Sequence, residues 1–97
     1  MNLNSKQKSY LRSLAHKLKP VVMIGNAGKS DNVISEIDRS LSHHELIKVR
    51  LSGLERDDRI NIANELCQET SSELINVIGH IAIIYRAAKK PKIKLPD

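Results

Sequence analysis

Apolar residues in this chain recur at two spacings, one helical and one typical of strands. Spacings of three and four residues predict helices over about 5–18, 30–43 and 58–70. Short apolar or alternating runs predict strands at 21–24, 45–52, 74–78 and 81–85. Helices that alternate with strands and end in a hairpin indicate an α/β fold. We expect three helices packed on a small mixed four-stranded sheet, in the order α-β-α-β-α-β-β.

The first helix carries a clear apolar stripe. Leu11, Leu14 and Leu18 recur at helical spacing and are expected to be buried. Pro20 follows, and it ends the helix because it has no N–H to donate and holds the preceding residue extended.

The connections that follow have local signals of their own. The strand at 21–24 is apolar throughout, which predicts that both of its faces are covered. Ser30 or Asp31 is the expected N-cap of the second helix. Gly79 and His80 separate the last two strands and predict a tight hairpin.

Two later details concern the core. In the strand at 45–52, Ile47, Val49 and Leu51 alternate in step, whereas Leu46 is out of phase. Cys67 falls on the apolar face of the third helix and is expected to be a small buried hydrophobe.

Length and composition indicate one domain. The 97 residues suffice for a single core, which we assign to 1–86. The basic, proline-containing tail at 87–97 is expected to lie extended on the surface or to be mobile. The single cysteine excludes an internal disulfide. We expect a cytoplasmic protein without membrane contact, because no signal peptide and no apolar run of roughly 18 residues is present.

Charge is segregated along the sequence. Residues 1–30 contain six basic residues and no acid, whereas 31–85 contain ten acids and five bases. Residues 86–97 contain five bases and one acid. This pattern predicts a face that binds polyanions opposite a face that repels them. The alternative is a basic chain whose charged ends are simply solvated.

A glycine-rich turn follows the first strand. Gly25-Asn26-Ala27-Gly28 precedes Lys29 and the start of the second helix. Glycine has no Cβ and the first helical N–H groups have no intrahelical partner, so this turn favours a phosphate. The alternative is a turn that needs glycine only for its own shape.

The first helix supplies most of the expected nucleic-acid contacts. Lys8, Arg12 and His16 are four residues apart and stack along one face. We expect this flank and the glycine-rich turn to form one continuous cradle for a sugar–phosphate chain. The candidate RNA-binding residues are Lys6, Lys8, Arg12, Lys17, Lys19, Gly25, Asn26, Ala27, Gly28 and Lys29.

Other chemistry finds little support in the sequence. Met23 stands where a nucleotide-binding P-loop needs its first glycine, so NTPase activity is not expected. His43 and His44 are adjacent and diverge on a helix, where a position at the C-terminus suits their charge better than a metal does. We predict no catalytic residues, no metal, no cofactor and no small-molecule substrate.

The aromatic content limits how nucleic acid could be held. The chain has no Phe or Trp, and its tyrosines are Tyr10 and Tyr85. Tyr10 is a candidate for stacking on a base, whereas Tyr85 lies in an apolar strand and is expected in the core. Binding should therefore depend mainly on phosphate and sugar contacts and on shape.

Together these segments resemble a known family. The run from Leu3 to Arg86 resembles a single CRM (chloroplast RNA splicing and ribosome maturation) domain of the bacterial YhbY type. The resemblance is carried by residues 6–22, 24–28, 43–50, 77–80 and 85–86. It implies a fold like the C-terminal domain of translation initiation factor three, with RNA bound through the basic first helix and the GxxG loop. It also implies an association with precursor large ribosomal subunits.

Three functions remain to be compared. The first is a non-enzymatic RNA-binding protein that contacts ribosomal RNA during large-subunit assembly, with ribosomal proteins as further partners. The second is an adaptor whose acidic central segment docks a ribosomal protein. The third is a small enzyme acting on nucleotides or RNA, for which the sequence offers no pair of catalytic groups.

Overall fold

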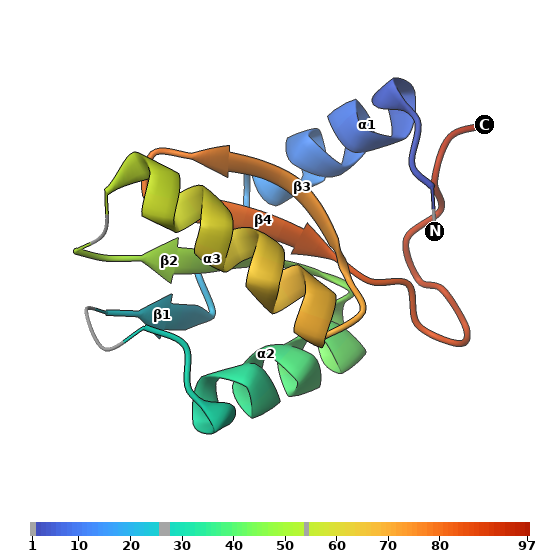
Figure 1. The fold of residues 1–97 in the computed structure, drawn as a ribbon. Helices are drawn as coiled ribbons and strands as arrows, with labels where there is room; N and C mark the ends of the chain where they lie inside the picture. The colour runs from blue at the N-terminus through green and yellow to red at the C-terminus, as the bar shows by residue number, and fades with distance from the viewer. Residues whose placement is uncertain (1, 26–27, 54) are drawn as a thin grey trace.

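Three helices and four strands make up the structure, a computed structural model that describes residues 2–25, 28–53 and 55–97 (Figure 1). In chain order the elements are α1 (Ser5–Ala15), β1 (Val22–Ile24), α2 (Asp31–His44), β2 (Leu46–Leu51), α3 (Arg56–Glu69), β3 (Glu73–Ile78) and β4 (Ile81–Tyr85). The predicted fold class and element order are confirmed.

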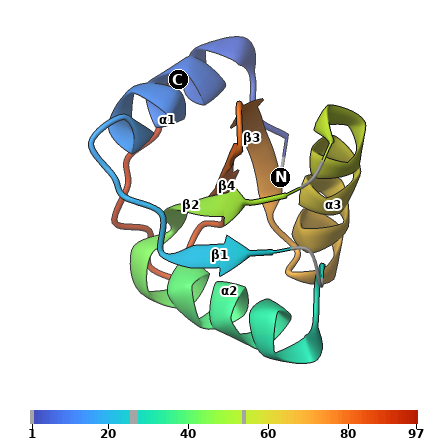
Figure 2. The same cartoon turned by 90° about the vertical axis from the view of Figure 1, so that its left-hand side faces the viewer.

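The strands form one mixed sheet in the order β1-β2-β4-β3. β1 runs parallel to β2, and the other neighbours are antiparallel. Figure 2 views the sheet from its β1 side, with α1 against one face and α2 and α3 against the other. The two surfaces of the sheet are called below the α1 face and the α2/α3 face.

A separate core fills each side of the sheet. Ile47, Val49 and Leu51 are buried in the α2/α3 core, whereas Leu46 is buried in the α1 core. At its start β2 is covered by α1 on one face and by α2 on the other. Two consecutive residues, Leu46 and Ile47, are therefore both buried, one in each core. Tyr85 is 1% exposed in the α1 core, as expected.

The ends of the helices follow local hydrogen bonding. Asn4 and Gln7 form a capping box at the start of α1. Ser30 caps α2, since its hydroxyl accepts the N–H of Val33 at 3.3 Å. Such a cap stabilises a helix by about 1 kcal/mol.

The prediction for the end of α1 is wrong by one turn. The helix ends at Ala15, where the N–H of His16 is shared between the carbonyls of Arg12 and Ser13. The chain then turns toward β1, so Leu18 is 38% exposed instead of buried. Ala15, the last residue of the helix, is 0% exposed. Among the described residues, no helix is long and apolar enough to cross a membrane.

The prediction that both faces of the first strand are covered is also wrong. Val22 and Ile24 are buried in the α2/α3 core, but Met23 between them is 64% exposed on the α1 face. The reason is geometric: β1 is an edge strand, and α1 packs on β2, β3 and β4.

A buried carboxylate holds the tail. Glu45 links α2 to β2 with a positive φ of 64° and is 0% exposed. Its oxygens accept the backbone N–H groups of Ala88 (2.8 Å), Lys92 (2.8 Å) and Ile93 (2.9 Å). Burial raises the pKa of Glu45, but the three donors outweigh it and the pKa is lowered overall.

The rest of the tail lies along α1. Ile93 and Leu95 pack against the α1 core, and the Gln7 amide donates to the Pro96 carbonyl at 3.0 Å. Residues 87–97 contain no helix or strand but are tied to the domain at both ends.

Candidate nucleic-acid interface

One flank of α1 presents positive charge beside the sheet. Lys8 and Arg12 are exposed and one helical turn apart, and His16 caps the same flank. Arg12 donates to the hydroxyl of Ser9 at 2.9 Å, which limits the freedom of the guanidinium.

Strand β2 adds two cations that are not among the predicted RNA-binding residues. Val49 and Leu51 face the α2/α3 core, so Lys48 and Arg50 face the α1 side. Lys48 is partly buried and Arg50 is exposed. Lys48, Arg12 and His16 line one depression of about 280 Å³, which brings α1 and β2 together at this surface.

The signal for these two cations was present in the sequence. The alternation that placed Ile47, Val49 and Leu51 on one face places Lys48 and Arg50 on the other. Counting charge by segment hid them, because they belong to a stretch that is acidic overall. Lys8, Arg12, Lys48 and Arg50 are called below the cationic group.

The remaining predicted lysines lie elsewhere. Lys6 is exposed on the flank of α1 opposite Lys8, by helical geometry. Lys17 is exposed just beyond the helix, and Lys19 borders an apolar hollow described below. The structure therefore distributes the predicted basic set over more than one side of α1.

The glycine-rich turn is partly described. Gly25 is exposed, and Gly28 adopts a φ of 77° that favours glycine. A Cβ built at either glycine would have no neighbour within 4 Å, so the space outside is open. Asn26 and Ala27 lie outside the described residues. The open approach leaves room for a phosphate at these two glycines.

Lys29 is engaged by α3 on the α2/α3 side. Its Nζ lies 3.0 Å from the Glu69 carboxylate and 3.7 Å from that of Glu65. The hydrogen bond to Glu69 raises the pKa of Lys29. Lys29 therefore lies on the α2/α3 side, bound to α3, and not beside the basic flank of α1.

Acidic residues gather on the face opposite the cationic group. Eight of the ten acids of 31–85 belong to α2, to α3 or to the N-cap of α3. They are Asp31, Glu36, Asp38, Glu55, Asp57, Asp58, Glu65 and Glu69. A polyanion approaching that side would meet repulsion, which leaves the α1 face as the favourable side.

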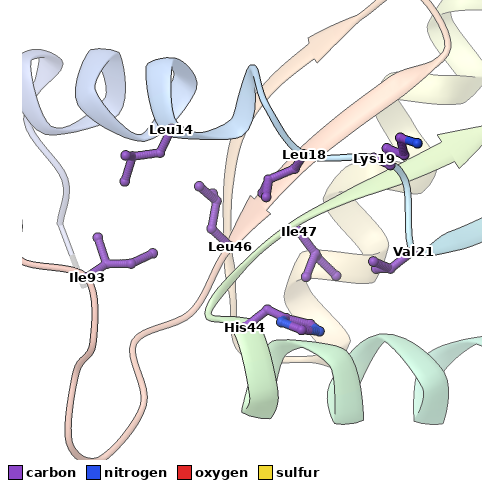
Figure 3. A pocket seen from close by; sticks show the side chains of 8 residues that line it. All are labelled: Leu14, Leu18, Lys19, Val21, His44, Leu46, Ile47 and Ile93. Carbon is purple, nitrogen blue, oxygen red and sulfur yellow. The ribbon is translucent and has the colours of Figure 1, made fainter.

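One hollow of the surface is apolar. It measures about 490 Å³ and opens between α1, the start of β2 and the tail (Figure 3). Leu14, Leu46 and Ile93 line one side of it, while Lys19 and His44 supply its polar groups.

Reactive and metal-binding groups are sparse. Cys67 is 6% exposed, and burial raises the pKa of its thiol to about 11, which disfavours a nucleophilic thiolate. The described residues contain no group of three or more His, Cys, Asp or Glu that could hold a metal ion. His43 and His44 occupy the last turn of α2, where sequence placed them.

Comparison with known proteins identifies the family. The sequence matches the profile of the CRS1 / YhbY (CRM) domain over residues 3–86. It is 45% identical over 94 residues to an RNA-binding protein of Haemophilus influenzae, covering 97% of this chain and 95% of the relative. A Pseudomonas aeruginosa protein named a probable RNA-binding protein is 42% identical over 97 residues, covering 100% and 93%.

A solved structure agrees with these matches. The solution structure of a Staphylococcus aureus protein with a suggested RNA-binding role has a TM-score of 0.86 at 45% identity. The match covers 98% of this chain and 100% of that protein. The resemblance drawn from the sequence is confirmed, and the chain belongs to the CRS1 / YhbY (CRM) domain family.

Proposed function

We propose that this protein binds RNA without catalysing a reaction, and that its target is ribosomal RNA in precursor large ribosomal subunits in the cytoplasm. The observation that carries the proposal is the cationic group on the α1 face, opposite helices that hold most of the acids. Such a surface suits a sugar–phosphate chain and orients it. The family relationship and the RNA-binding names of the relatives support the same partner.

The ribosomal target rests on the family resemblance. The cationic group explains attraction to any RNA, because phosphates carry no sequence information. Gly25, directly after β1, and Gly28 each have open space outside the backbone, and we include both glycines in the proposed RNA-binding surface with Lys8 and Arg12 of α1.

The adaptor hypothesis is less well supported by the structure. Glu65 and Glu69 are engaged by Lys29, and Asp38 forms a 2.6 Å ion pair with Arg86. Part of the acidic charge is therefore neutralised within the chain, which leaves less of it to attract a basic ribosomal protein.

The test follows the protein through ribosomal particles separated by sedimentation. We expect the wild-type chain to travel with precursors of the large subunit at low salt. Arg50→Glu should release it, because a negative charge then sits among the cations. Arg39→Glu is the matched control, since Arg39 is an exposed arginine of α2 on the other side of the sheet.

Two outcomes would overturn the proposal. One is a wild-type protein that stays at the top of the gradient at low salt and binds no purified ribosomal RNA. The other is release by Asp57→Lys/Asp58→Lys with full retention of Arg50→Glu, which is the pattern that an acidic docking surface predicts.

A further inference from the structure

Part of the α1 face is left bare, and its side chains form a row across all four strands. Met23 of β1 pairs with Arg50 of β2, Arg50 with Ile81 of β4, and Ile81 with Ile78 of β3. Met23 is 64% exposed and Ile78 57% exposed, two of the most exposed large apolar side chains described. Ile81 between them is partly buried. Met23, Arg50, Ile81 and Ile78 are called below the exposed row.

The row lies where α1 does not reach. The helix ends at Ala15, and its buried residues pack at the other end of the sheet, against Leu46 and Tyr85. Figure 2 shows the chain leaving α1 and passing beside the sheet to reach β1, with no helix over that strand on this side.

Positive charge borders the row. Arg12 and Lys48 line the same depression as Ile78 and Ile81, and the His16 side chain lies beside them. On the far side of Ile78 a second depression is lined in part by Arg56 of α3. An apolar floor thus has cations on both sides and an arginine at its centre.

We propose that the exposed row binds the unpaired bases of a single-stranded RNA segment, while Arg12 and Lys48 contact the adjoining phosphates. This inference rests on the proposed function and specifies how the RNA is held. Unpaired RNA combines flat apolar base faces with regular negative charge, which is the complement of an apolar row bordered by cations. In a double helix the base faces are stacked on one another, so they are not available to an apolar row on the protein.

The dimensions agree with a short segment. Neighbouring strands are about 4.8 Å apart, so a row across four strands spans about 14 Å. Four-stranded RNA-binding sheets hold about two or three bases over such a surface. Here Met23 offers a flexible, polarisable thioether in place of an aromatic ring, and the Arg50 guanidinium is a plane on which a base can stack.

The test compares three labelled probes by fluorescence anisotropy at low salt. They are a 12-nucleotide single strand, an abasic strand of the same length and charge, and a duplex. The variant is Met23→Ser/Ile78→Thr, which removes apolar surface from the row without changing charge. The control is Val21→Ser, since Val21 is 45% exposed but borders the apolar hollow of Figure 3.

The wild-type protein should bind the single strand more tightly than the abasic strand. The double variant should lose about tenfold in affinity for the single strand, with duplex and abasic binding changed less than twofold. The Val21→Ser control should match wild type on every probe. Circular dichroism and gel filtration confirm that the double variant is folded and unchanged in oligomeric state.

The inference fails if the double variant keeps single-strand affinity within twofold of wild type, or if all three probes weaken equally. If Arg50→Glu still abolishes binding in that case, RNA binding by the cationic group stands and only the base platform is refuted. Absence of binding to every probe by the wild-type protein would instead refute the proposed function. Loss of a wild-type dimer in the double variant would assign the row to a second copy of the chain and refute the inference.

Discussion

The buried Glu45 carboxylate should be essential for stability, and the substitution Glu45→Gln tests this. The carboxylate accepts three backbone N–H groups of the tail: Ala88 on Oε2, and Lys92 and Ile93 on Oε1. An amide retains one acceptor oxygen, so two donors keep a neutral partner. The amide nitrogen then faces the third N–H, donor against donor.

The magnitude follows from these contacts. A hydrogen bond to a charged group contributes about 1.5–3 kcal/mol, and a neutral one about 1 kcal/mol. Losing one charged bond and weakening two others should lower the free energy of unfolding by about 3 kcal/mol. For a domain of this size that lowers the melting temperature by about 12–24 °C.

The pH dependence supplies a second readout. The pKa of Glu45 is lowered in the folded protein from an ordinary value of 4.5. Its contribution to stability is therefore complete above the unfolded pKa and is lost as the pH falls through the folded pKa. Urea unfolding between pH 3 and 7, roughly the range over which carboxylates titrate, should show a shallower acid slope for Glu45→Gln than for wild type.

Glu36→Gln is the matched control, because Glu36 is exposed on α2. It should change the free energy of unfolding by less than about 0.5 kcal/mol. If Glu45→Gln unfolds within that margin of wild type and keeps the wild-type acid slope, the carboxylate does not anchor the tail and the reasoning is wrong.

Two further predictions concern charge and the thiol. If each residue of the cationic group neutralises one phosphate of a single strand, affinity for RNA should fall about 50-fold between 50 and 200 mM salt. Arg50→Ala should then reduce the slope of log K against log salt by about 0.7. An unchanged slope in Arg50→Ala would exclude Arg50 from the interface. Burial raises the pKa of the Cys67 thiol to about 11. At pH 8 the thiol should therefore react with a thiol reagent only as fast as local or global unfolding exposes it. Equal reaction rates in buffer and in urea would show instead that the side chain is accessible in the folded protein.

Sequence patterns predicted the elements and their order because α2 is strongly amphipathic and the hairpin strands are short apolar runs separated by Gly79 and His80. They failed where the environment depends on distant parts of the chain. Nothing local shows that α1 stops short of β1, so an apolar run including Met23 looked buried on both faces. Likewise, Glu45 receives its donors from residues more than 40 positions later, which no local pattern reveals.

The candidate site was predicted in part for a related reason. Charge counted along the sequence identified the basic helix but placed Lys48 and Arg50 in the acidic segment. The pleat of β2 separates them from that segment, because alternate side chains of one strand face opposite sides of the sheet. Conversely, Lys29 follows a basic stretch in sequence, yet the chain carries it across to Glu69 on α3.

The same pleat explains how so small a domain can hold two opposite surfaces. Each strand must bury alternate residues against α2 and α3, and this leaves the intervening residues for the α1 side. A helix that ends at Ala15 covers only part of that side, so the strand positions beyond it are under no requirement to be apolar. A purely solvated surface would favour polar residues there, since exposed apolar area gains nothing from folding. Met23 and Ile78 are apolar while Arg50 between their strands is charged, which is the combination that the proposed contact with unpaired RNA requires.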